Sequence, residues 1–107
     1  MTKRYDDLPG ALKGEIRELA GVAHERLLAV ELRKLDGEFG RWRLGELDAF
    51  EMSTLVHQFH EGPPRELWLR FNTNDVRVLG LFVMEALADG MLRMEELSEE
   101  LRVFLGL

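Results

Sequence analysis

Apolar residues recur every three or four positions through the first third of the chain, and this spacing restricts the fold more than any other feature. The residues that share it are Leu12, Ile16, Leu19, Ala20, Ala23, Leu27, Leu28, Leu32 and Leu35. A period of 3.6 residues places such positions on one face of an α-helix. The pattern therefore predicts a helix from about residue 9 to Leu35, ended by Asp36-Gly37.

Shorter segments later in the chain have the same spacing. We expect helices over about 45–61, 76–88 and 94–106, and a short helix that begins at Pro63-Pro64. No segment alternates apolar and polar residues over the length of a strand. The sequence predicts a single all-α domain over residues 1–107, with four main helices in two helix–loop–helix halves plus a short linker helix.

Composition excludes several kinds of site and partner. Apolar residues make up 46% of the chain and charged residues 32%, which is typical of a globular protein with a buried core. Because there is no cysteine, disulfides, thiolate zinc sites and cysteine nucleophiles are excluded. The formal net charge of −6 disfavours nucleic acid as a partner, since phosphates are neutralised by a concentrated positive surface.

The sequence also lacks the apolar segments that are typical of secretory signals and membrane spans. The first residues, MTKRYDDLPG, include basic side chains but no apolar segment behind them, so we expect no secretory signal. The longest uncharged apolar stretch lies between Arg77 and Glu85 and is shorter than a membrane span. These features predict a cytoplasmic protein with no membrane partner.

Two turns between expected helices have similar sequences, GRWRLGEL at residues 40–47 and GMLRMEEL at 90–97. In each, an apolar residue follows the glycine by two positions and a glutamate follows it by six. This spacing resembles the second half of an EF-hand loop, in which the glycine makes the turn and the glutamate closes the calcium site. The alternative is two ordinary turns that both need a glycine and a glutamate at the start of a helix.

The EF-hand resemblance implies a paired helix–loop–helix layout and different ligand sets in the two loops. The early positions of the first loop have no side-chain oxygen, so we expect no calcium there. In the second loop, Glu85, Asp89 and Glu96 would form at best a weak calcium site.

The segment HQFHEG at residues 57–62 is the one cluster that suggests metal chemistry. His57 and His60 are three residues apart, so two imidazoles lie on one face of a helix and could share a divalent metal. Glu61 or Glu46 would be the third ligand of a metal-binding protein or metal-dependent enzyme. The alternative is a solvated helix end, because HExxH and related motifs are missing.

The segment 76–88 is apolar on almost every side, and such a helix lies either in the core or beneath a partner. Aromatic residues outside the expected stripes are typical of contact surfaces. We therefore expect a protein-interaction or regulatory module, acting as a homodimer or on a protein partner, with no catalytic residues and no resident cofactor. An enzyme is the less favoured class. The expected contact surface consists of Phe50, Trp68, Phe71, Leu79 and Phe82.

Overall fold

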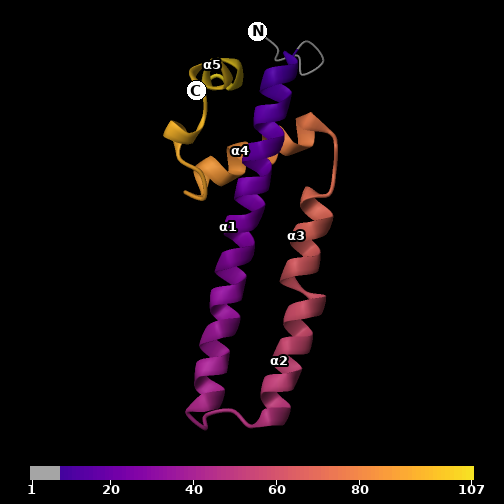
Figure 1. The fold of residues 1–107 in the computed structure, drawn as a ribbon, viewed down its shortest axis with the longest axis vertical. Coiled ribbons are helices and arrows are strands. Elements are labelled where there is room, and N and C mark those ends of the chain that lie inside the picture. Colours follow the sequence, from indigo (N-terminus) through magenta and orange to yellow (C-terminus); the bar gives the residue numbers. More distant parts are fainter. Residues whose placement is uncertain (1–7) are drawn as a thin grey trace.

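The computed structural model describes residues 8–107 and consists of helices joined by short turns (Figure 1). The helices are α1 (Gly10–Arg43), α2 (Ala49–Glu61), α3 (Pro63–Phe71), α4 (Val76–Ala88), the 3-10 turn η2 (Met94–Glu96) and α5 (Glu99–Leu105). No strand occurs in this described part of the chain, so the all-α prediction is confirmed.

Helix α1 runs along the molecule, which measures 57 × 24 × 20 Å, and every other α-helix contacts it (Figure 1). The predicted end at Asp36-Gly37 is wrong, because the helix continues to Arg43. A glycine inside a helix costs only about 1 kcal/mol relative to alanine. Leu35, just before Gly37, lines a groove together with Leu55 and Phe59 of α2, and this packing supports the longer helix.

The core lies at one end of the molecule, which we call the head: the first half of α1, α4, the turn after α4, and α5 (Figure 1). Ile16, Val83 and Leu101 are completely buried there. Around them lie the other buried apolar residues of the head, namely Leu8, Leu12, Leu19, Ala20, Ala23, Leu79, Ala86, Leu92, Leu97 and Leu105. Helix α4 is thus covered along one side by the head itself.

The other end of the molecule is a two-helix hairpin, which we call the arm: residues 27–61, with α2 antiparallel to the second half of α1 (Figure 1). Among the described residues of the arm, Met52 alone is buried. Helix α3 continues beyond α2 along α1 and leads back to the head. The arm therefore lacks a core of its own.

Side-chain caps mark the beginnings of three helices. At α2, the Asp48 carboxylate accepts a hydrogen bond from the Glu51 amide at 2.7 Å, and the Glu51 carboxylate accepts one from the Asp48 amide at 3.1 Å. This reciprocal pair satisfies two amides that the helix leaves unpaired. Asp75 and Ser98 cap α4 and α5 through single hydrogen bonds.

The two similar segments at 40–47 and 90–97 have different backbone conformations. Gly40 lies inside the last turn of α1, whereas Gly90 follows α4 with a φ of +77°. In the first segment the left-handed position is Gly45, with a φ of +80°. Their sequence similarity therefore does not correspond to a repeated turn.

Candidate functional site

One stripe of apolar residues follows the second half of α1. Its members, Leu28, Leu32, Leu35, Phe39 and Trp42, are spaced by four, three, four and three residues. This is the heptad spacing of a and d positions in coiled coils and helical bundles. The stripe thus has the pattern of a helix that packs against other helices along its length.

A matching stripe follows α2. Ala49, Met52, Val56 and Phe59 are spaced by three, four and three residues. Both helices of the hairpin therefore have heptad stripes over the same part of the molecule.

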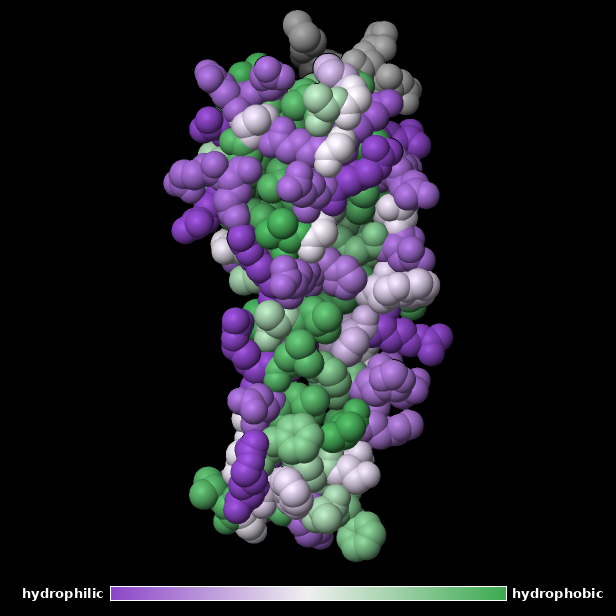
Figure 2. All heavy atoms as spheres, in the orientation of Figure 1, coloured by the Kyte–Doolittle hydropathy of each residue, from purple (hydrophilic) through white to green (hydrophobic). Residues whose placement is uncertain are grey.

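These stripes bury each other only in part: Met52 is buried, whereas Leu28, Leu35, Phe39 and Phe59 are half-buried. In a closed coiled coil, a and d residues pack into the partner helix and leave the solvent. Here Leu32 is 49% exposed, Trp42 42% and Val56 38%. Figure 2 shows a continuous apolar band along the lower half of the molecule, over α1 and α2. We call this surface the arm face and define it by Leu28, Leu32, Leu35, Phe39, Val56 and Phe59.

Charged residues of α1 border the arm face. Glu31, Lys34 and Glu38 line a groove between α1 and α2 together with Leu35 and Phe59 of the arm face. Lys34 pairs with Glu31 at 3.1 Å, and Arg41 pairs with Glu38 at 2.9 Å. Ion-paired side chains therefore lie beside the apolar residues of the arm face.

Large apolar residues also lie at the tip of the arm. Phe50 is 85% exposed and Leu44 is 78% exposed. Trp42 packs edge-on against Phe39, with ring centroids 6.4 Å apart. The tip thus extends the apolar surface beyond the arm face.

The structure separates the residues that the sequence predicts as a contact surface. Phe50 and Trp68 are exposed, on α2 and α3. Phe71 and Phe82 contact each other, with centroids 5.0 Å apart, and are partly buried against the core. Leu79 is only 4% exposed and belongs to the core, so it is inaccessible to a partner in this fold. Most apolar side chains of 76–88 pack in the core of the head, which explains why this segment is apolar, although Leu81 remains exposed.

His57 and His60 are exposed on α2 and gain no third ligand. Glu61 instead lies 3.8 Å from Arg65. Within residues 8–107, no three or more histidine, aspartate or glutamate side chains are grouped closely enough to hold a metal ion.

The carboxylates of the EF-hand-like loop also have separate roles. Glu85 pairs with Arg70 of α3, Asp89 is the C-cap residue that follows α4, and Glu96 pairs with Arg26 of α1. In the described part of the chain these carboxylates form no group that could hold a metal ion. The EF-hand resemblance itself stays a prediction.

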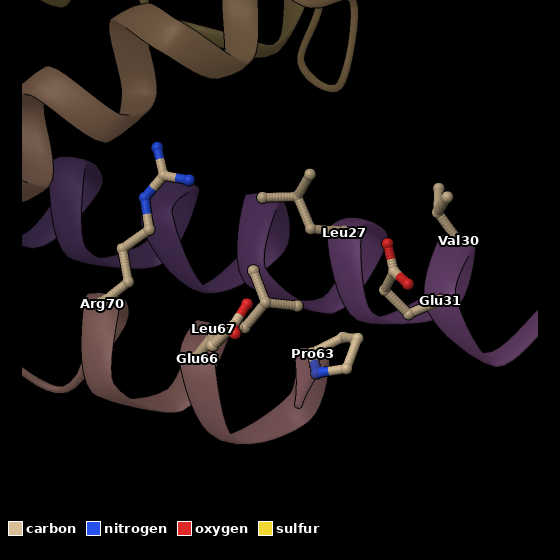
Figure 3. Close-up of a pocket in the computed structure, with 7 residues that line it drawn as sticks. All are labelled: Leu27, Val30, Glu31, Pro63, Glu66, Leu67 and Arg70. Atoms are coloured by element: carbon tan, nitrogen blue, oxygen red, sulfur yellow. The ribbon is translucent and has the colours of Figure 1, made fainter. Parts of the chain in front are cut away.

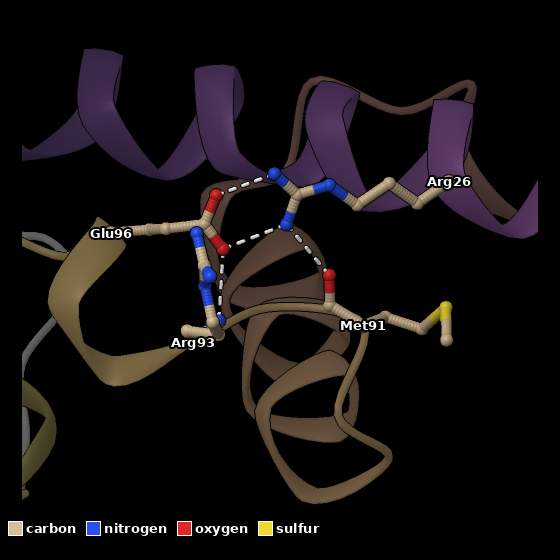
Figure 4. Close-up of polar contacts among 4 residues, drawn as sticks. All are labelled: Arg26, Met91, Arg93 and Glu96. Carbon is tan, nitrogen blue, oxygen red and sulfur yellow. Dashed lines mark hydrogen bonds and ion pairs between the residues drawn. The ribbon is translucent and has the colours of Figure 1, made fainter.

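Arg26 fastens the turn after α4 to α1 (Figure 4). It donates to the two carboxylate oxygens of Glu96 at 2.5 and 2.7 Å and to the Met91 carbonyl oxygen at 2.8 Å. The Arg93 amide donates to Glu96 at 2.9 Å. The hydrogen bond from Arg26, followed by that from Arg93, lowers the pKa of Glu96 to about 2.

A groove of about 350 Å³ lies between α1 and α3 (Figure 3). Glu31 of α1 and Glu66 and Arg70 of α3 line it beside apolar residues. Arg70 is already paired with Glu85. The groove contains neither a nucleophile nor a histidine, so it offers no catalytic arrangement.

Sequence reasoning missed the arm face because it placed Leu28, Leu32 and Leu35 on the same buried side as Ile16. The angles of these residues around the helix axis could have revealed the error. Ile16 and Leu32 are sixteen residues apart, which at 100° per residue separates them by about 160° around the axis. One straight helix cannot direct both residues into the same core.

No family model, curated protein or solved structure matches the chain. Within residues 8–107, no helix has both the length and the apolar character needed to cross a membrane. The arm face is therefore interpreted from its own geometry.

Proposed function

We propose that the protein is an interaction module that forms a homodimer through the arm face. The observation that carries the proposal is a partly exposed apolar face with heptad spacing on both helices of an arm that buries only Met52. Contiguous exposed apolar patches mark interaction sites on proteins.

The first argument is energetic. Ordering one residue costs about 1–2 kcal/mol of backbone entropy, and burial of apolar surface is the main term that offsets this cost. The head buries the apolar residues of several segments, whereas the arm buries one side chain. A partner on the arm face supplies the missing burial.

The second argument identifies the partner. A four-helix bundle directs the a and d positions of all four helices toward a shared centre. The arm supplies two helices of this kind, so its face fits two more helices with the same spacing. A second copy of the chain provides them, and a two-fold axis brings the same residues to both sides of the interface.

The third argument is size. The part of α1 in the arm, seventeen residues at 1.5 Å each, is about 25 Å long, and two adjacent helices are about 20 Å wide. Their face therefore covers on the order of 500 Å² before side-chain relief is counted, which is comparable with the roughly 800 Å² that each partner contributes to a standard interface. The apolar tip adds to this area.

Native mass spectrometry of the full chain tests the proposal directly, with a dimer as the expected species. A chain that is monomeric at about 100 µM would contradict it, since that corresponds to binding weaker than roughly −5.5 kcal/mol.

Disulfide cross-linking then locates the interface, because the natural chain has no cysteine to compete. Single substitutions Leu28→Cys, Leu32→Cys, Leu35→Cys and Val56→Cys sample the arm face, and Leu81→Cys is the matched control on the head. A disulfide needs Cα atoms about 4.4–6.8 Å apart, so only positions near the two-fold axis are expected to link. Dimers linked through Leu81→Cys alone would place the interface on α4 instead.

A further inference from the structure

A hollow of about 290 Å³ lies between α1 and the turn after α4. It is on the other side of α1 from the arm face: Arg26, in its wall, and Leu28 are two residues apart and thus about 160° apart around the helix. Every charged residue of its lining is an arginine, Arg26, Arg33 or Arg93, and no carboxylate is among the lining residues. This is notable in a chain with a net charge of −6.

One of these arginines is already in use. Both ends of the Arg26 guanidinium bind Glu96, and Arg26 also donates to the Met91 carbonyl oxygen (Figure 4). Arg26 therefore holds the wall of the hollow in place, and the Glu96 carboxylate balances its charge.

The other two arginines are not used in this way. Among the described residues, the guanidinium groups of Arg33 and Arg93 form no hydrogen bond or ion pair, although the charge of Arg93 contributes to the low pKa of Glu96. Arg33 extends from α1 and Arg93 from the turn. Two carboxylates act on Arg26, Glu96 through hydrogen bonds and Glu25 through space. Three guanidinium groups and these two carboxylates leave an excess of positive charge at the hollow.

The rest of the lining is apolar or open. Ala29 and Val30 of α1 face Met91 of the turn. Gly90 has a φ of +77°, and a Cβ placed there would meet no atom within 4 Å. A glycine at this position allows the left-handed turn and leaves the edge of the hollow free of a side chain.

We propose that this hollow binds a small-molecule phosphate monoester. Its phosphate group lies between Arg33 and Arg93, and its organic part packs on Val30 and Met91. A phosphate monoester carries about −1.5 to −2 charges near pH 7, which complements the positive charges of Arg33 and Arg93. Guanidinium groups bind phosphate through paired, charge-assisted hydrogen bonds. The hollow is near the lower end of the size range of small-ligand sites, about 300–1,000 Å³.

Isothermal titration calorimetry with phenyl phosphate, inorganic phosphate and phenol tests the proposal. We expect saturable binding of phenyl phosphate at one site per chain, weaker binding of inorganic phosphate, and none of phenol. Arg33→Gln should weaken the binding of phenyl phosphate about tenfold or more, the usual effect of losing a charged hydrogen-bond donor. Arg17→Gln, an exposed position on the same helix outside the hollow, is the control with the same charge change and should bind normally.

Three results would overturn the proposal. One is no saturation by phenyl phosphate at 10 mM. Another is an equal loss of affinity in Arg17→Gln and Arg33→Gln, which would indicate only the overall charge. Equal affinity for inorganic phosphate would show that the apolar wall takes no part and that the ligand is not a monoester. Because the hollow and the arm face lie on different sides of α1, this binding is expected in monomer and dimer alike.

Discussion

Replacing Leu32 with glutamate tests the arm face near its middle. The Leu32 side chain is 49% exposed and lies outside the core of the head. In the monomer, a glutamate at this position can extend into solvent, and glutamate forms helices nearly as well as leucine. We therefore expect Leu32→Glu to fold normally and to lose dimerisation.

The size of the loss follows from this exposure. Full burial of a leucine side chain contributes about 1.5–3 kcal/mol, so burying the exposed half contributes about 1 kcal/mol in each chain. A buried polar group without a partner costs about 1–3 kcal/mol, and more when charged. Because the two-fold axis applies both effects twice, the dimer should weaken by at least about 4 kcal/mol, roughly a thousandfold in Kd.

Sedimentation velocity over a range of concentrations measures this shift, and thermal unfolding followed by circular dichroism confirms the fold. Leu81→Glu is the matched control, because Leu81 is 62% exposed but lies on α4 of the head. A Leu32→Glu dimer as tight as the natural one would refute the arm-face argument. Loss of the dimer in Leu81→Glu only would show that α4 forms the interface.

Three further predictions concern the stability of the head and the arm. Ile16 is completely buried, so Ile16→Ala should lower the free energy of unfolding by about 2–5 kcal/mol in urea denaturation, whereas Leu44→Ala at the exposed tip should change it little. Asp48→Ala removes the capping box of α2 and should cost about 1 kcal/mol, with faster hydrogen exchange in its first turn, while Asp48→Asn keeps most of the cap. The pKa of Glu96 is lowered to about 2 in the folded chain from its usual 4.5, so its contribution to stability is complete above about pH 5 and is lost as the pH falls toward 2. A pH series of thermal melts should show a smaller acid-side loss in Glu96→Gln than in the natural chain; identical profiles would assign the loss to other groups.

The helical character of the chain could be predicted because it depends on neighbours in sequence. The spacing of apolar residues alone indicates α1, and Pro63 together with Gly62 correctly separates α2 from α3. The end of α1 could not be predicted in the same way. Gly37 lowers the stability of the helix by only about 1 kcal/mol relative to alanine, and packing of α1 against α2 offsets this cost.

The exposed apolar surface of the structure lies on a different segment from the contact surface that the sequence predicts. An apolar contact surface was expected on the segment 76–88, and Leu79 of that segment is instead part of the core. Phe50 and Trp68 were expected to be exposed, and they are. The metal interpretation of His57 and His60 required Glu61 or Glu46 as a third ligand. Glu61 lies beside Arg65 and Glu46 pairs with Arg41, and the sequence contains no signal for either ion pair.

The sequence by itself determined that the chain is helical and where most helices occur, because helix formation depends on contacts within a few residues. Only the tertiary structure decided which apolar sides are covered. Leu32 and Leu79 are both leucines in α-helices, yet the Leu32 side chain is 49% exposed and the Leu79 side chain is 4% exposed. The difference arises because α4 crosses the first half of α1 and leaves the second half open, with Arg26 and Glu96 joined across 70 residues. Such long-range contacts depend on how whole helices pack together, and no short segment of sequence specifies them.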